Sequence, residues 1–170
     1  MHNLPDKQKE KPEGILRRSE ARMAAVKAIY AVEIAWESGE KADPWAVTLG
    51  IISSYDESHE DHHFNVRPDE KYLAKIIKGV FENLDSIDLV IERNLSESWS
   101  KERIGHVMLA LLRASVYEIS SFQKIPFKII INEYINIARG FFNEKEVGFV
   151  NGILDKIARE VRDEGGNTGI

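Results

Sequence analysis

Residues 125–161 read IPFKIIINEYINIARGFFNEKEVGFVNGILDKIAREV, and this stretch decides the fold. Its apolar side chains recur at intervals of three and four residues in two groups: Ile131, Tyr134, Ile135, Ala138 and Phe142, then Val150, Ile153, Leu154, Ile157 and Val161. This spacing predicts two amphipathic helices joined by a glycine-bearing corner. Pro126 suits the start of the first helix. Neither helix can bury its apolar stripe alone, so the rest of the chain must supply helices for packing.

The same periodicity predicts five further helices before this stretch. We expect them over about Leu16–Trp36, from Pro44 through Ile52, from Pro68 through Leu84, after an Asp85-Ser86 cap through Leu95, and from Ser100 through Ile119. The β-branched run at 129–131 suits a strand by propensity, but its place after a proline and inside a helical stripe favours helix. The prediction is an all-α bundle of about seven helices.

Composition and charge limit the class of protein. A chain of 170 residues suits one domain, which we place at residues 14–162, with a polar, disordered leader at 1–13 and a glycine-containing flexible tail at 163–170. The absence of cysteine excludes disulfides and thiolate chemistry. No apolar run approaches the ~20 residues that span a bilayer. We therefore expect a cytoplasmic protein without a membrane partner.

A basic cluster near the start of the first predicted helix is the main candidate for a binding site. It comprises Arg17, Arg18, Arg22, Lys27 and the aromatic Tyr30. Arginine suits phosphate and aromatic rings suit unstacked bases, so RNA is one interpretation. The alternative is a solvated helix end. The net charge of −5 argues against general nucleic-acid affinity and leaves room for a local patch. Arginines near the N-terminus of a helix interact unfavourably with the helix macrodipole, which suggests that they are present for a functional reason.

The corner before the last helix offers a second candidate. Phe149 is either a core residue or a platform on which a base could stack, and Lys145 would favour phosphate beside it. The Asn151 amide has donors and acceptors that can contact base edges. These side chains supplement the basic cluster in the RNA interpretation.

We predict no catalytic, metal or cofactor site. Glu133 and Asp155 could form an acid–base pair in principle, but each pairing with a structural neighbour is the favoured interpretation. His59, His62 and His63 are metal-ligand types in a polar stretch predicted to be a loop, and a solvated loop is favoured over a metal site. The chain has no glycine-rich phosphate loop.

Several ordered motifs resemble the NusB family of transcription antitermination factors. They are RSEAR at 18–22 with AVKAIY at 25–30, Tyr72, Gly79-Val80 and Ile87-Asp88, LRASVYEI at 112–119, and Ile125-Pro126 followed by INE at 131–133 and FVNGILD at 149–155. The resemblance extends from Arg17 to Arg162. Ser19 and Glu20 depart from it, because family members often have arginines there.

The resemblance implies a fold of two packed three-helix bundles plus one additional helix, and a non-enzymatic activity. Family members pair with NusE, a small-subunit ribosomal protein, and bind single-stranded boxA RNA in nascent ribosomal RNA. The RNA polymerase antitermination complex then reads through terminators. By resemblance, Arg18 and Arg22 contact RNA, with Tyr30 and the Phe149 corner as further contacts. Met108, Tyr117 and Glu118 would face NusE.

Three alternatives remain open at this point. The same fold occurs as the N-terminal domain of a ribosomal-RNA cytosine methyltransferase, which would make the chain an accessory RNA-binding domain. A second alternative is a protein-interaction bundle that never touches RNA. A homodimer that buries the RNA face is the third.

Overall fold

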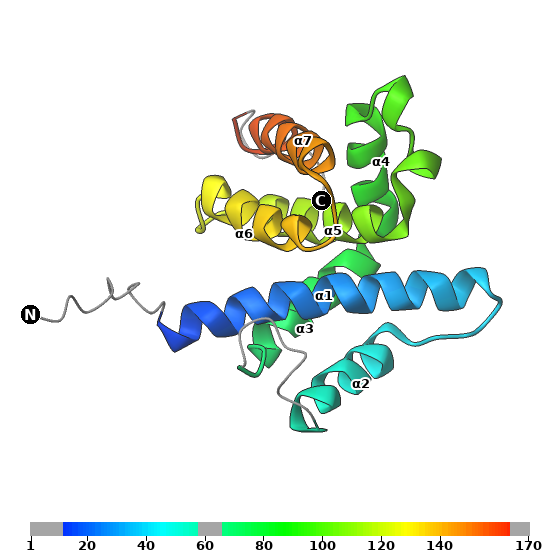
Figure 1. Ribbon diagram of the computed structural model, residues 1–170, viewed down its shortest axis with the longest axis vertical. Coiled ribbons are helices and arrows are strands. Elements are labelled where there is room, and N and C mark those ends of the chain that lie inside the picture. Colours follow the sequence, from blue (N-terminus) through cyan, green and yellow to red (C-terminus); the bar gives the residue numbers. More distant parts are fainter. Residues whose placement is uncertain (1–11, 58–65, 164–170) are drawn as a thin grey trace, which may run out of the picture.

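The computed structural model describes residues 12–57 and 66–163, and Figure 1 shows their arrangement. The helices are α1 (Glu13–Glu37), α2 (Pro44–Glu57), α3 (Glu70–Glu82), α4 (Leu84–Asn94), the 3₁₀ helix η1 (Glu97–Trp99), α5 (Lys101–Ser121), α6 (Phe127–Arg139) and α7 (Glu144–Asp163). Within the described ranges there is no strand, and the run at 129–131 is helical. The predicted all-α fold with seven α-helices is confirmed.

Helix α1 lies between two groups of helices (Figure 1). On one side it packs against α2 and α3, and on the other it packs against α5 and α6. Helices α5, α6 and α7 form the second group, and α4 adds to it through contacts with α5 and α7. This arrangement matches two three-helix bundles with one additional helix. It also makes α5 the element against which most of the chain is packed.

The core consists of the predicted apolar stripes. Both stripes of the 125–161 stretch are buried, apart from Phe142, which is half-buried just beyond the end of α6. The largest wholly buried side chains from the other helices include Ile29, Leu73, Ile76, Ile91, Leu111 and Leu112. Because a single cluster joins all seven α-helices, no helix of the described chain forms a separate unit.

Some helix boundaries differ from the prediction because of tertiary contacts and caps. Helix α2 was expected to end at Ile52 but continues to Glu57, because Tyr55 is buried and its hydroxyl donates to Glu20. Helix α3 begins at Glu70 rather than at Pro68, because the Asp69 side chain caps it by accepting from the backbone N–H of Tyr72 at 3.1 Å. Sequence reasoning missed η1 and the positive φ of Gly105 (78°), which kinks α5 near its start.

Gly79 allows α3 and α5 to approach closely. A Cβ atom built on Gly79 would lie 1.8 Å from the ring of Tyr117 on α5. Carbon atoms that are not bonded to each other do not come so near, so only glycine fits here without movement of the Tyr117 ring. Tyr117 is thereby held against α3 and also packs edge-on against Phe122, with 6.0 Å between ring centres.

A partly buried ion pair connects α4 to α5. The Arg113 guanidinium donates to both carboxylate oxygens of Asp88 at 2.8 and 2.9 Å, and Lys101 lies 3.2 Å from the same carboxylate. Burial alone would raise the pKa of Asp88, but hydrogen bonds and charge attraction from Arg113 and then Lys101 outweigh it and lower that pKa. The folded state therefore favours the ionised carboxylate.

We expect Asp88→Asn to lower the free energy of unfolding at pH 7 by about 1–3 kcal/mol, because Arg113 keeps only Glu33, at 3.0 Å, as a charged partner. The folded pKa of Asp88 lies below its unfolded value of about 3.9. The stabilisation is therefore present above about pH 4 and is lost as the pH falls through the folded pKa. Urea unfolding at pH 7 and pH 3 checks this. A deficit of the variant that is equal at both pH values would contradict it.

Parts of the predicted leader and tail, residues 1–11 and 164–170, lie outside the described residues, as does the histidine-containing segment 58–65. In the described part, α1 begins at Glu13 and α7 continues to Asp163, so the helical domain is slightly longer than predicted at each end. None of the helices described here has the length and apolarity that crossing a bilayer demands.

Candidate nucleic-acid interface

Two arginines of the first turns of α1 are exposed and held in place by α3 and the segment before it. Arg17 donates from Nε to the carbonyl of Arg67 at 3.4 Å, and its own carbonyl accepts from the backbone N–H of Asp69 at 2.9 Å. The Arg18 guanidinium carbon lies 5.1 Å from the centre of the Tyr72 ring, within cation–π range. We call Arg17 and Arg18 the α1 tip. Its positive charges face solvent, where phosphate can reach them.

Arg22 is not part of this exposed surface. Its side chain is 4% exposed, and its guanidinium donates to Glu118 from Nε at 2.9 Å and from Nη2 at 2.7 Å. Burial alone would lower the pKa of Arg22, but the hydrogen bond and the charge of Glu118 raise it instead. Arg22 is therefore a permanently charged core residue. The prediction that it contacts RNA is wrong, because its donors are already engaged inside the protein.

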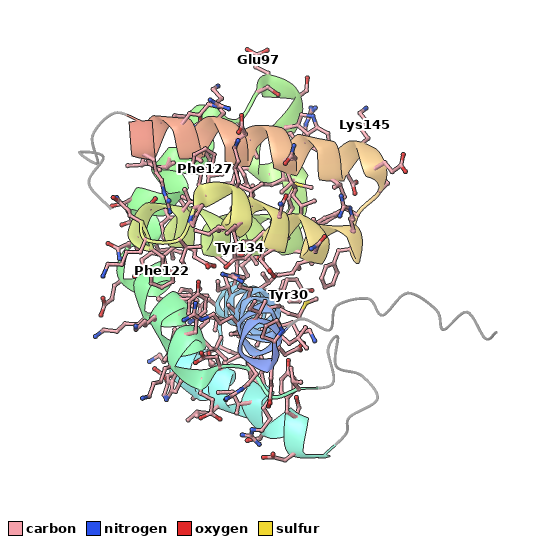
Figure 2. All side chains as sticks on the ribbon, turned by 90° about the vertical axis from the view of Figure 1, so that its left-hand side faces the viewer. Tyr30, Glu97, Phe122, Phe127, Tyr134 and Lys145 are labelled. Atoms are coloured by element: carbon pink, nitrogen blue, oxygen red, sulfur yellow. The ribbon has the colours of Figure 1, made fainter. Side chains whose placement is uncertain are left out.

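The Arg22–Glu118 pair belongs to a buried polar network. Glu118 is fully buried and also accepts from the hydroxyls of Tyr72 and Tyr134, the latter at 2.7 Å. Figure 2 shows Tyr134 between α6 and α1. Together these side chains connect α1, α3, α5 and α6. The positive charge of Arg22 near the start of α1 is unfavourable to the helix macrodipole. Glu118 compensates this charge inside the protein, so no ligand is needed to explain it.

Ser19 and Glu20, which stand where the family often has arginines, also point inward. Ser19 Oγ donates to Glu133 at 2.7 Å, and Glu20 accepts from Tyr55. Both side chains are buried. The exposed cationic surface at the start of α1 is consequently smaller than the sequence cluster indicates.

Lys27 and Tyr30 lie on other faces of α1 than Arg18. At 3.6 residues per turn, nine positions separate Arg18 from Lys27 by about 180° around the helix. Tyr30 is 38% exposed, and in Figure 2 it lies on the opposite side of α1 from Phe122, which packs beside Tyr72. The structure therefore does not bring Lys27 and Tyr30 together with the α1 tip.

The α6–α7 corner exposes Lys145 and Asn151, and Lys145 projects outward from the first turn of α7 (Figure 2). Phe149 is half-buried, because its ring stacks on Trp99 of η1 with 4.3 Å between centres and 10° between planes. One face of that ring is thus already covered by a protein side chain. Lys145 and Asn151 remain free to face a ligand.

Two of the three predicted partner-binding residues are in the core. Met108 is 2% exposed and Glu118 is fully buried, so neither can touch another protein in this structure. These two predictions are wrong because both side chains point from α5 toward neighbouring helices. Tyr117 is half-buried against Gly79 and Phe122.

The carboxylates that resembled an acid–base pair have separate structural partners. Glu133 binds Ser19 and lies 3.6 Å from Arg22, whereas Asp155 pairs with Arg159 on its own helix at 3.0 Å. The favoured interpretation of both residues is confirmed.

Sequence reasoning missed a cluster formed by Glu33, Glu37 and His106, whose ligand atoms lie within 4.8 Å of one another. The carboxylates approach different ring nitrogens, Glu37 near Nε2 at 3.2 Å and Glu33 near Nδ1 at 3.8 Å. Glu33 also lies 3.0 Å from Arg113, so this carboxylate already has a cationic partner within the protein.

Comparison with known proteins identifies the family. The family model described as "NusB family" matches residues 19–159. The chain belongs to the NusB family. Its similarity to curated proteins supports this assignment. The chain is 37% identical over 150 residues to the transcription antitermination protein NusB of Caulobacter vibrioides, and the match covers 86% of this chain and 95% of that protein. The NusB protein of Rickettsia bellii is 37% identical over 148 residues, covering 86% and 92%. Because this is a family of non-catalytic factors, the protein is not an enzyme.

Solved NusB structures share the fold. NusB of T. maritima superposes with a TM-score of 0.68 at 32% identity, covering 84% of this chain and 91% of the other. A chain from a crystal structure of NusB and NusE in complex with double-stranded RNA gives the same TM-score at 22% identity, covering 86% and 98%. At that identity the likeness shows the fold alone.

Proposed function

We propose that this NusB-family protein is a transcription antitermination factor that acts in the cytoplasm. With NusE, it binds boxA RNA of nascent ribosomal RNA transcripts and helps RNA polymerase to read through terminators. The observation that carries the proposal is the α1 tip, where Arg17 and Arg18 are exposed while Arg22 is sequestered. Family membership and the antitermination name of the curated relatives support it.

The small size of the cationic surface predicts a weak RNA binder that depends on its partner. Two exposed arginines on a chain of net charge −5 displace few counterions, so affinity and salt dependence should both be modest. A bound partner that extends the surface adds contacts, and linkage raises the apparent RNA affinity. NusE has this role in our proposal.

Titration of labelled boxA RNA with the protein alone and with added NusE tests the proposal. We expect preferential binding of boxA over a scrambled RNA, and an affinity several-fold higher when NusE is present. Equal affinity with and without NusE would defeat the cooperative mechanism. Co-purification with NusE without any RNA shift would instead favour a protein-interaction bundle.

A further inference from the structure

A hollow of about 430 Å³ lies between the start of α2 and one face of α3. Its lining residues are Asp43, Pro44, Trp45, Ala74, Ile77, Lys78, Phe81 and Glu82. The residues from α3 are spaced three and four positions apart, so they form a single stripe along that helix. No residue of any other described helix lines the hollow, which we call the α2–α3 groove.

The two groups of helices differ in how they cover such a groove. In the second group, α5, α6 and α7 pack on one another, and α4 is added against both α5 and α7. In the first group, α1, α2 and α3 pack on one another in the same way. Within the described ranges, no fourth helix lies in the α2–α3 groove. The groove therefore has the position that a helix fills in the other group.

Aromatic side chains held by the fold border the groove. The Trp36 indole N–H donates to the Ala42 carbonyl at 2.9 Å, and the Trp36 ring packs edge-on against Phe81 with 5.5 Å between ring centres. Asp43 accepts from a backbone N–H of the first turn of α2 at 2.8 Å, which fixes the turn that carries Trp45. Trp36 and Trp45 are nevertheless 43% and 39% exposed. Pre-positioned tryptophans are typical anchors of protein interfaces, because ordering them costs little on binding.

Carboxylates outnumber cations around the groove. Asp43 and Glu82 line it, and the Lys78 ammonium lies 3.9 Å from the Glu82 carboxylate, at the limit of an ion pair. An adjoining hollow of about 270 Å³ shares the Phe81 wall and adds two more carboxylates, together with an arginine that is already paired within the protein. An occupant with positive charge is therefore favoured over a negatively charged one.

We propose that the α2–α3 groove docks a short amphipathic helix of a partner protein. Its apolar side chains enter between Trp45 and Phe81, and its basic side chains face Asp43 and Glu82. A helix suits the groove because two packed helices present parallel ridges into which a third can insert its side chains. The inference goes beyond the proposed function, since docking here leaves both RNA and NusE bound. A second copy of the chain is disfavoured, because two acidic rims would meet.

A designed peptide serves as the probe. It has about 18 residues of leucine and lysine in amphipathic helical order, and a second peptide carries glutamate in place of lysine. Isothermal titration calorimetry of the full chain with each peptide measures affinity. We expect the lysine peptide to bind about tenfold more tightly than the glutamate peptide, because only its charges complement the rim.

Trp45→Gln should weaken binding of the lysine peptide about tenfold, because it removes an anchor without changing charge. Leu89→Gln is the matched control, since Leu89 is a 63% exposed apolar residue of α4, outside the groove. It should bind the peptide like the wild type. Circular dichroism checks that both variants keep the helical content of the wild type.

A charge substitution tests the rim independently of the aromatic anchors. The Glu82 side chain is 62% exposed, so Glu82→Lys should leave the fold intact. We expect it to weaken the lysine peptide and strengthen the glutamate peptide, each about threefold. Glu97→Lys, at an exposed position of η1, is the control and should change neither affinity.

Peptide binding that persists in the complex with NusE and boxA RNA would support a separate docking site. Equal affinity for the two peptides would overturn the inference, as would wild-type affinity in both Trp45→Gln and Glu82→Lys. Displacement of the peptide by NusE would assign the groove to the NusE surface, which also contradicts a separate site. A dimer of the wild type that Trp45→Gln abolishes would assign the groove to a second copy and overturn the inference.

Discussion

Arg22→Met should lower the free energy of unfolding by about 3–5 kcal/mol, the usual effect of breaking a buried ion pair by removing one partner. The reason is the environment of Glu118, which is fully buried and receives both Nε and Nη2 of Arg22. Methionine fills similar volume but leaves that carboxylate charge without a cation. For a protein of this size, the melting temperature should fall by roughly 6–20 °C.

A second substitution shows whether the uncompensated charge causes this loss. Adding Glu118→Gln to Arg22→Met removes the buried charge, while the amide oxygen can still accept from the Tyr134 hydroxyl. The double variant should therefore be more stable than Arg22→Met alone. Thermal and urea unfolding followed by circular dichroism measure both effects. A single variant within about 1 kcal/mol of the wild type would show that the pair is not structural, and would reopen an RNA role for Arg22.

The charge reversal Arg17→Glu/Arg18→Glu should weaken RNA binding without lowering stability, the opposite of the effects that we expect for Arg22→Met. We expect boxA binding to weaken more than tenfold, because two phosphate contacts are lost and replaced by repulsion. The slope of log affinity against log salt concentration should decrease in magnitude by about 1.4, the value for two contacts with single-stranded nucleic acid. Fluorescence anisotropy of labelled RNA at several salt concentrations measures both quantities.

Folding should be unaffected by this change, since glutamate near a helix N-terminus is favourable. Arg103→Glu is the matched control, because Arg103 is also exposed in the first turn of a helix, α5. It should change boxA affinity less than threefold and leave the salt slope as in the wild type. An effect as large as that of the α1 tip would mean that net charge, and not this site, governs RNA binding.

The fold was predictable because its signals are local. Apolar residues at intervals of three and four identify each helix without knowledge of its neighbours, and all ten stripe residues of the 125–161 stretch, apart from half-buried Phe142, are buried. The end of α2 was less predictable. It depends on the contact of Tyr55 with Glu20, two residues that lie 35 positions apart in the sequence.

The candidate site was harder to predict because burial of a charge depends on a distant partner. Arg18 and Arg22 are one helical turn apart and look equivalent in sequence, yet Arg22 meets Glu118, 96 residues away. One signal was present: Arg22 lies on the same line as Ala25 and Ile29, both buried. Phe149 presents the same difficulty, since its stacking partner Trp99 lies in a 3₁₀ helix that no periodicity indicates.

Crosslinking tests the central claim most directly, that the α1 tip, and not Arg22, contacts the transcript. BoxA RNA carrying 4-thiouridine would be irradiated in complex with the protein and NusE, and the crosslinked peptides mapped. We predict crosslinks at Arg17 or Arg18 that disappear in Arg17→Glu/Arg18→Glu. Crosslinks confined to surfaces remote from the start of α1, and unchanged in that variant, would contradict the account.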